Sequence, residues 1–246
     1  DNWGTPEAYH EGFVTMGTRD GVEVVIISAD DAGSIEIAEA LRGRGTRVVT
    51  VGESPDADVC LTDLAFTPEL TSATLTAADD AGLLELIVPG RFNLHNAAAA
   101  YAVGREVGLD GAVARAALRA FAGTHRRFEA KGAVNGVRVF DDYAHHPTEV
   151  EAILTAARGR AGDGRLVACF QPHLFSRTRD FAAEFGDSLA LADEIVVLGV
   201  YPAREAQVDY PDVTGRLVAD AAAAASGRAV TYVEDVTDAP AALASL

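Results

Sequence analysis

The sequence predicts an α/β fold with two domains, the second of them built on a doubly wound, Rossmann-like sheet. Two observations support this prediction. Short apolar segments alternate with helical segments bounded by capping residues and glycines, which is typical of βαβ units with a parallel sheet. In the second half of the chain this alternation is almost unbroken. We place the boundary at Gly123-Thr124, which divides the 246 residues into domains 1–123 and 124–246.

The first domain is expected to begin with a short amphipathic helix, because Pro6, Tyr9 and Phe13 have helical spacing. A strand follows, and Asp30-Asp31 can cap a helix that runs to residue 42. The last three strands of this domain have the alternation of an antiparallel meander at its edge. The predicted strands span 22–28, 47–51, 59–64, 73–77 and 83–88, and two further helices span 93–107 and, after a cap at Asp110, the segment to residue 121.

The second domain is expected to begin with a β-hairpin, since Asn135-Gly136 between two short strands is a strong hairpin signal. Pro147 and Glu149 suit the first turn of a helix, where a proline lacks no needed N–H and a carboxylate complements the helix dipole. The predicted strands span 128–133, 137–140, 166–170, 194–198 and 229–233, and the predicted helices span 147–158, 175–191, 213–225 and 239–246.

Composition excludes several classes of partner. The net charge of −17 argues against binding to nucleic acid or to an anionic membrane. No apolar run approaches the roughly 20 residues of a membrane span, and no basic segment followed by an apolar one predicts a signal peptide. Cys60 and Cys169 are far apart and lack the spacing of metal ligands, so we expect buried free thiols in a reducing, cytoplasmic compartment.

The richest group of chemically active side chains follows the predicted strand 137–140. Asp141, Asp142, Tyr143, His145 and His146 are packed into one strand-to-helix turn. Open α/β sheets bind their ligands at such carboxyl ends of strands. A solvated polar loop would explain any one of these residues, but two adjacent histidines among six in the chain favour a functional site.

Two further clusters contain amides and arginines. Asn93 and Asn96 are three residues apart, so both can face one side of a first helical turn, where carboxamides suit the edge of an adenine. The alternative for Asn93 is a simple helix cap. Arg126 and Arg127 precede Phe128 at the domain boundary and could clamp phosphate or ribose oxygens, although a solvated charge run is the alternative.

The segments after the next two predicted strands are also polar. His173 and Arg177 follow the strand 166–170, and Arg177 lies near a helix start, where the dipole disfavours positive charge. We therefore expect something anionic at this position. Tyr201 and Arg204 follow the strand 194–198. Three successive strand ends would then bring histidine, arginine and tyrosine side chains to one sheet edge.

Five segments of the chain, taken in order, resemble those of the Mur ligases. They are NxxN, RRFE, DDYAHHPTEV, QPHLFSRT and VYPAREA. The resemblance covers nearly the whole chain from Asn2-Trp3-Gly4 onward, and DDYAHHPTEV with QPHLFSRT is its most specific part. It implies the C-terminal part of a central ATPase domain in residues 1–123 and the C-terminal, amino-acid-side domain in residues 124–246. The implied activity is ATP-dependent C–N bond formation. Within the family the chain is most similar to members that join L-alanine to UDP-N-acetylmuramate through an acyl phosphate, in cytoplasmic peptidoglycan precursor synthesis.

The resemblance also implies roles for individual residues. Asn93 and Asn96 would contact adenine, and Arg127 and Asp142 would contact the ribose and phosphate region of the nucleotide. His145 and Arg177 would be catalytic. The residues that would bind substrate are Tyr143, His145, His173, Arg177 and Arg204. His145 would position or deprotonate the alanine ammonium. The sequence departs from the family at Phe92, where many relatives have histidine, and at Leu174, where some have a substrate-binding arginine.

The family's phosphate-binding loop is not found in this sequence. No GxxxxGK[ST] occurs, and Lys131, followed by Gly132, cannot be the lysine of such a loop. The family's magnesium-binding histidine would lie just before Asp1, so the ligands of Mg²⁺ are expected outside this chain. We therefore expect part of a ligase, inactive without the missing N-terminal part of the same enzyme. The alternatives are a stand-alone nucleotide-binding or scaffolding module and a piece of a murein tripeptide ligase.

Overall fold

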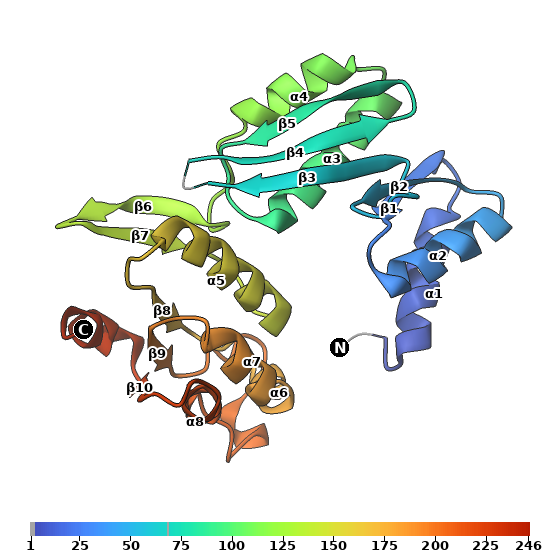
Figure 1. Ribbon diagram of the computed structural model, residues 1–246. Coiled ribbons are helices and arrows are strands. Elements are labelled where there is room, and N and C mark those ends of the chain that lie inside the picture. Colours follow the sequence, from blue (N-terminus) through green and yellow to red (C-terminus); the bar gives the residue numbers. More distant parts are fainter. Residues whose placement is uncertain (1–2, 68) are drawn as a thin grey trace. The chain divides into compact units, whose positions relative to one another are not determined.

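The computed structural model describes residues 3–67 and 69–246, and the chain divides into two compact units, Asp1–Ala122 and Gly123–Leu246 (Figure 1). Asn2, at the start of the family resemblance, lies outside the described residues. Each unit combines helices with a sheet that contains parallel strands, so the predicted α/β fold class is confirmed.

The first unit contains a five-stranded sheet in the order β1-β2-β3-β4-β5. Its elements are α1 (Pro6–Gly17), β1 (Val24–Ser28), α2 (Ala32–Gly43), β2 (Arg47–Gly52), β3 (Val59–Phe66), β4 (Thr71–Ala77), β5 (Asp80–Leu86), α3 (Arg91–Glu106) and α4 (Gly111–Ala120). The strands β1, β2 and β3 are parallel, whereas β3, β4 and β5 form the predicted antiparallel meander. Asp31 and Asp110 cap α2 and α4, as their positions in the sequence predicted.

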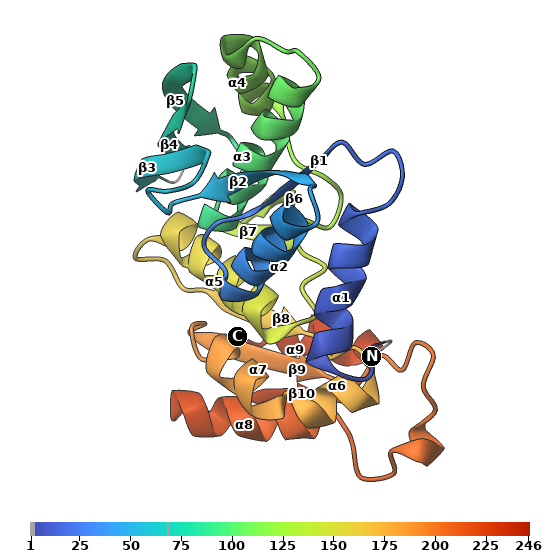
Figure 2. The same ribbon diagram turned by 90° about the vertical axis from the view of Figure 1, so that its right-hand side faces the viewer.

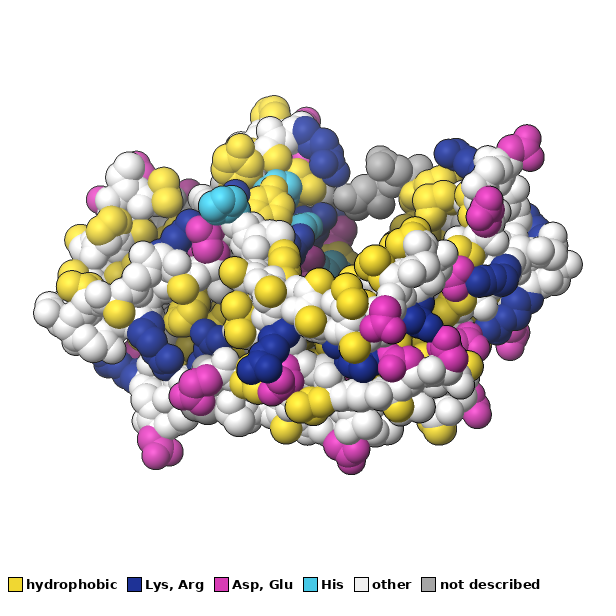
Figure 3. Space-filling view, turned by 90° about the horizontal axis from the view of Figure 1, so that it is seen from above, with side chains coloured by type: hydrophobic (Ala, Val, Ile, Leu, Met, Phe, Trp, Pro, Cys, Tyr) yellow, Lys and Arg dark blue, Asp and Glu magenta, His cyan; other side chains and the backbone are white. Residues whose placement is uncertain are grey.

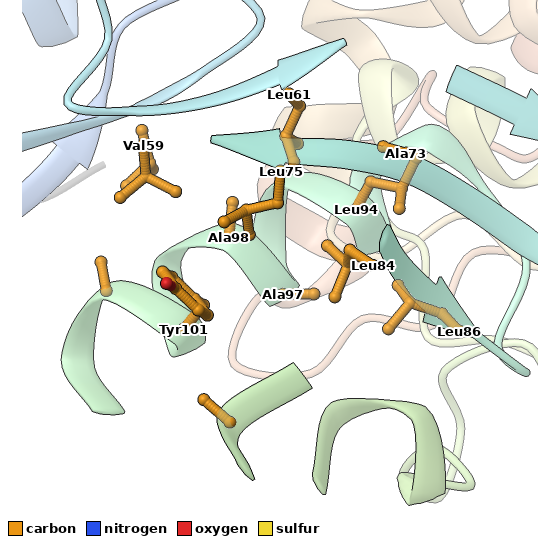
Figure 4. Packing of buried hydrophobic residues seen from close by; sticks show 13 residues of the cluster. Val59, Leu61, Ala73, Leu75, Leu84, Leu86, Leu94, Ala97, Ala98 and Tyr101 are labelled. Carbon is orange, nitrogen blue, oxygen red and sulfur yellow. The ribbon is translucent and has the colours of Figure 1, made fainter. Parts of the chain in front are cut away.

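The core of the first unit lies between this sheet and α3 (Figure 4). Alternate residues of β4 are buried, as expected for a strand with one face against the core. Tyr101 of α3 is completely buried, and its hydroxyl donates to the carboxylate of Asp80 at 2.6 Å. Burial and this carboxylate raise the pKa of Tyr101 to about 12. Arg115 of α4 forms an ion pair with the same carboxylate, which therefore joins β5 to both helices.

The second unit contains a parallel sheet in the order β10-β9-β8 and a separate hairpin, β6-β7. Its elements are β6 (Glu129–Val134), β7 (Val137–Asp141), α5 (Pro147–Ala161), β8 (Val167–Phe170), α6 (Phe175–Asp180), α7 (Ala182–Leu189), β9 (Glu194–Leu198), the 3-10 helix η1 (Gln207–Asp209), α8 (Arg216–Ser226), β10 (Thr231–Val233), the 3-10 helix η2 (Val236–Asp238) and α9 (Ala239–Ala244). The middle strand β9 is buried on both faces. Ile195 and Val197 pack in the core with α5, α7 and α8, whereas Val196 and Leu198 pack with Ala239 of α9. Figure 2 shows these helices around the strands of the sheet. Helices thus cover both faces, as in a doubly wound sheet.

The hairpin forms where Asn135-Gly136 predicted it. Both residues have positive φ, 50° and 82°, which is the geometry of a type I′ turn. Lys131 of β6 is the single lysine of the chain, and its Nζ lies 2.8 Å from a carboxylate oxygen of Glu129. This contact, with hydrogen bonds from Arg126 N–H and His125, lowers the pKa of Glu129 to about 2.

Some predicted boundaries were wrong. The helix predicted for 175–191 is broken at Phe181, whose φ of −123° and ψ of 20° end α6 and turn the chain into α7. The ring of Phe181 instead packs against His146, with ring centroids 5.1 Å apart. Helix α3 begins at Arg91, two residues earlier than predicted, because Gly90 adopts a φ of 102° and takes the N-cap position. Helix α8 begins at Arg216 rather than at residue 213. The prediction that both cysteines are buried was also wrong, because Cys60 is only partly buried and Cys169 of β8 is exposed.

The surface mixes charge of both signs. On the face shown in Figure 3, acidic and basic side chains are interspersed rather than grouped by sign. Within the described residues, no helix is both long enough and apolar enough to cross a membrane.

Candidate active site

The turn between β7 and α5 is fixed by a capping box. The side chain of His146 accepts a hydrogen bond from Thr148 N–H, while one oxygen of Glu149 accepts from the backbone N–H groups of His145 and His146, at 2.9 and 3.1 Å. Pro147 occupies the first helical position, where its missing N–H is not needed. The capping box therefore fixes the backbone conformation at His145.

The hydrogen bond made by His145 defines its tautomer. Its Nδ1 lies 2.8 Å from the carbonyl oxygen of Tyr143. Because a carbonyl can only accept, Nδ1 carries the proton and Nε2 of the neutral ring has a lone pair. His145 can thus accept a proton at Nε2, which a residue that deprotonates an ammonium must be able to do.

Asp142 has a structural role that the sequence did not indicate. One carboxylate oxygen accepts from Phe128 N–H and the other from Ala144 N–H, both at 2.7 Å. Burial raises the pKa of Asp142, although these two hydrogen bonds and the charge of Arg127 oppose the shift. Arg127 also lies 3.9 Å from Glu149. Asp142 therefore ties the start of the hairpin to the turn that follows it.

The loops after β8 and β9 are joined through their backbones. Leu174 N–H donates to the carbonyl of Tyr201 at 2.9 Å, and Tyr201 N–H donates to that of Pro172 at 2.8 Å. Leu174 is buried and has a φ of 70°, a conformation that a leucine rarely adopts. The rings of His173 and Tyr201 consequently stack, with centroids 5.6 Å apart.

These loops and the β7–α5 turn bring four aromatic rings together. The ring of His145 is 5.3 Å from that of Tyr143 and 6.0 Å from that of His173, between centroids, and His173 in turn stacks on Tyr201. The ends of β7, β8 and β9 thus come together as the sequence suggested. The roles of these residues stay predictions.

Two nitrogen atoms in this region are buried without a hydrogen-bond partner in the described part of the chain, Nδ1 of His173 and Nη1 of Arg177. Burial lowers the pKa of His173, and the positive charges of Arg177, His145 and Arg204 lower it further, against the opposing charge of Glu205. A buried donor without a partner costs about 1–3 kcal/mol. A bound acceptor, and an anion most of all, would satisfy Arg177.

A carboxylate of the chain itself lies at the start of α6. Glu205 accepts hydrogen bonds from Ser176 N–H at 2.9 Å and from its hydroxyl at 2.5 Å. The anion that we expected at this helix start is therefore provided in part by Glu205. Its contacts hold the loop after β9 against the turn that contains Arg177.

The lowered pKa of His173 predicts a pH dependence of stability. The folded state binds a proton at His173 less readily than the unfolded state, so stability should fall as the pH drops below the usual histidine value of about 6.5. His173→Phe, which keeps a ring against Tyr201, should reduce the loss of melting temperature between pH 7.5 and 5.5. His125→Phe is the control, since its side chain is 95% exposed. An equal loss of melting temperature in the wild type and in His173→Phe would show that His173 does not cause the pH dependence.

The amide residues lie in the first unit, on the first turns of α3. Asn93 donates through Nδ2 to the carbonyl of Pro89 at 2.7 Å, and Asn96 is exposed. The alternative that Asn93 caps the helix is wrong, because Gly90 occupies the N-cap and no side chain caps it. The structure thus places the two amides in the first unit and the other candidate residues in the second.

Three acidic residues that the site residues depend on were not predicted as part of the site. The sequence indicates Glu149 only as a complement to the helix dipole, and Glu205 only as part of the segment VYPAREA. Glu53, described below, belongs to no recognisable motif. Among residues 3–67 and 69–246, no group of three or more His, Cys, Asp or Glu side chains could hold a metal ion.

Comparison with known families agrees with this architecture. The Mur ligase middle domain matches residues 1–104, and the domain described as "Mur ligase, glutamate ligase domain" matches residues 126–246. The chain belongs to the Mur ligase family. It is 55% identical to the UDP-N-acetylmuramate–L-alanine ligase of Cutibacterium acnes, over 99% of this chain and 52% of the relative. The ligase of the same name from Kineococcus radiotolerans is 51% identical, over 100% of this chain and 51% of the relative.

Solved structures show the same similarity. The UDP-N-acetylmuramate–alanine ligase MurC from Thermotoga maritima matches with a TM-score of 0.72 and 26% identity, over 96% of this chain and 48% of that one. MurF from Acinetobacter baumannii has a TM-score of 0.76 at 19% identity, over 99% and 49% of the two chains, and shows the fold alone. The chain spans about half the length of the curated relatives and solved chains that it matches.

Proposed function

We propose that the chain forms the adenine-facing and amino-acid-facing part of a cytoplasmic ATP-dependent ligase that joins L-alanine to UDP-N-acetylmuramate. The main support is the site at the ends of β7, β8 and β9. There His145 presents a lone pair on Nε2, and Arg177 has a buried nitrogen without a partner among the described residues. A proton acceptor and an anion-binding group at the ends of neighbouring strands suit the attack of an amine on an activated carboxylate.

In the proposed reaction the lactyl carboxylate of UDP-N-acetylmuramate takes the γ-phosphoryl group of ATP, which releases ADP and gives an acyl phosphate. His145 accepts a proton from the ammonium of L-alanine, so that the free amine attacks and phosphate leaves. Arg177 binds an oxygen of the anionic substrate, which a guanidinium does with charge-assisted hydrogen bonds. Tyr143, His173 and Arg204 complete the substrate site in this proposal.

For ATP, the proposal assigns the adenine to Asn93 and Asn96, and the ribose and phosphate region to Arg127 and Asp142. The carboxamides fit adenine because both can present a donor and an acceptor on one face of α3. The proposal places the ligands of Mg²⁺ outside this chain, as the resemblance to the family implies. When bound, Mg²⁺ neutralises charge on the transferring phosphoryl group.

The test compares the 246-residue chain with the complete ligase, meaning this chain joined to a phosphate-binding part. The complete ligase should release ADP only when both UDP-N-acetylmuramate and L-alanine are present. The chain alone should release none, because it has no GxxxxGK[ST] sequence to hold the phosphates. Steady, alanine-dependent ADP release by the chain alone would contradict the proposal that the chain needs a phosphate-binding part for activity. A complete protein without ADP release would favour a scaffolding module, and a preference for a tripeptide over L-alanine would favour a murein tripeptide ligase.

A further inference from the structure

A second polar cluster lies in the first unit, beside the start of α3, and the proposed function gives its members no role. Glu53 follows directly after β2, and one of its carboxylate oxygens lies 2.6 Å from Nε of Arg91 and 2.7 Å from Nε2 of His95. Its other oxygen accepts from Nη2 of Arg91. Arg91 is the first residue of α3 and His95 lies one turn later, so one carboxylate holds both ends of the first turn.

Glu53 is itself held in place. The carboxylate of Asp30, which follows β1, accepts the N–H groups of Glu53 at 2.9 Å and of Ser54 at 2.8 Å. It also lies 3.4 Å from Nδ1 of His95. A Cβ at Gly52 would overlap the Asp30 carboxylate, so the close approach requires glycine. The loop after β2 is therefore fitted to Asp30, and the position of Glu53 is defined.

The charges of the cluster stabilise the start of the helix. Burial alone would raise the pKa of Glu53, but hydrogen bonds from Arg91 and His95 outweigh it and lower the pKa below its usual value. Glu53 is therefore ionised at neutral pH. It neutralises Arg91, whose positive charge at a helix N-terminus would otherwise be unfavourable. No side chain caps α3 at Gly90, and this ion pair connects the first turn to the loop that follows β2.

The geometry points to Glu53 as a positioning residue for the nucleotide: it fixes the first turn of α3 and thereby the carboxamides of Asn93 and Asn96. This inference rests on the proposed function, in which those carboxamides contact adenine. Arg91 and His95 are four residues apart and share one face of the helix, whereas Asn93 and Asn96 share another. Glu53 can thus orient the turn without touching the nucleotide.

The test is Glu53→Gln in the complete ligase, because glutamine keeps the size of the side chain and removes its charge. We expect the KM for ATP to rise about tenfold, as is common when a residue that orients a binding group is lost. The KM values for L-alanine and UDP-N-acetylmuramate, and kcat at saturating ATP, should stay close to wild type. Arg91→Gln removes the same ion pair from its other side and should have the same selective effect.

Glu106→Gln is the matched control. Glu106 is the last residue of α3 and pairs with Arg47 at 2.9 Å, and its side chain is 26% exposed against 23% for Glu53. The two variants should lose similar melting temperature, but only Glu53→Gln should change the KM for ATP. An unchanged KM for ATP in Glu53→Gln, or an equal change in Glu106→Gln, would overturn the inference. Turnover of the unmodified ligase without ATP would instead refute the proposed function itself.

Discussion

Asp80→Ala is expected to lower the free energy of unfolding of the first unit by about 3 kcal/mol. The substitution removes the acceptor of the completely buried Tyr101 hydroxyl and the partner of Arg115, whose side chain is only 14% exposed. Both groups would be left buried without their hydrogen bonds. Urea unfolding of the 246-residue chain, followed by circular dichroism, measures the change.

The adjacent residue provides the control. Asp79 pairs with Arg105, but its side chain is 70% exposed, so Asp79→Ala should cost less than about 1 kcal/mol. Equal losses in the two variants would mean that the Asp80 cluster contributes no more than a surface ion pair.

Arg177→Ala is expected to reduce kcat/KM of the complete ligase by about 100-fold or more, the usual effect of losing a group that stabilises an anion in the active site. The reason is the buried Nη1, which has no hydrogen-bond partner among the described residues and is available to substrate. The melting temperature should stay the same or rise slightly, since the substitution removes an unsatisfied buried donor. Steady-state kinetics and thermal unfolding of the same preparation separate the two effects.

Arg179 lies on the same short helix and serves as the matched control. It is exposed, and its Nε pairs with the neighbouring Asp180 at 2.7 Å. Arg179→Ala should change kcat/KM by less than about threefold. A large loss of melting temperature in Arg177→Ala with unchanged kinetics would show that Arg177 is structural.

Local signals made much of the fold predictable. Asp31, Asp110 and Pro147 mark helix starts through contacts within one turn, and Asn135-Gly136 specifies its hairpin through backbone conformation. The break at Phe181 could not be predicted in the same way. No glycine or proline stands there, and the ring packs against His146, which is distant in sequence.

The candidate site was likewise predictable only where its residues follow a local sequence pattern. Strand ends and unusual residue types identified the turn at His145 and the loops of His173 and Tyr201, and the structure brings these rings together. The acidic residues that hold the site residues were harder to find. Glu53 is 38 residues before Arg91 and Glu205 is 29 after Ser176, so only the folded chain places them in contact. Long-range hydrogen bonds of this kind leave no local pattern in a sequence.

The lysine of the β6 hairpin has a practical consequence. Lys131 is the one side-chain primary amine in 246 residues, and it is 44% exposed despite its ion pair with Glu129. Apart from the backbone α-amine, an amine-reactive fluorophore can therefore be attached only to this one side chain of the second unit, without any substitution in the sequence. Its emission would then follow this hairpin while nucleotide is added, which gives an optical record of ligand binding that needs no turnover.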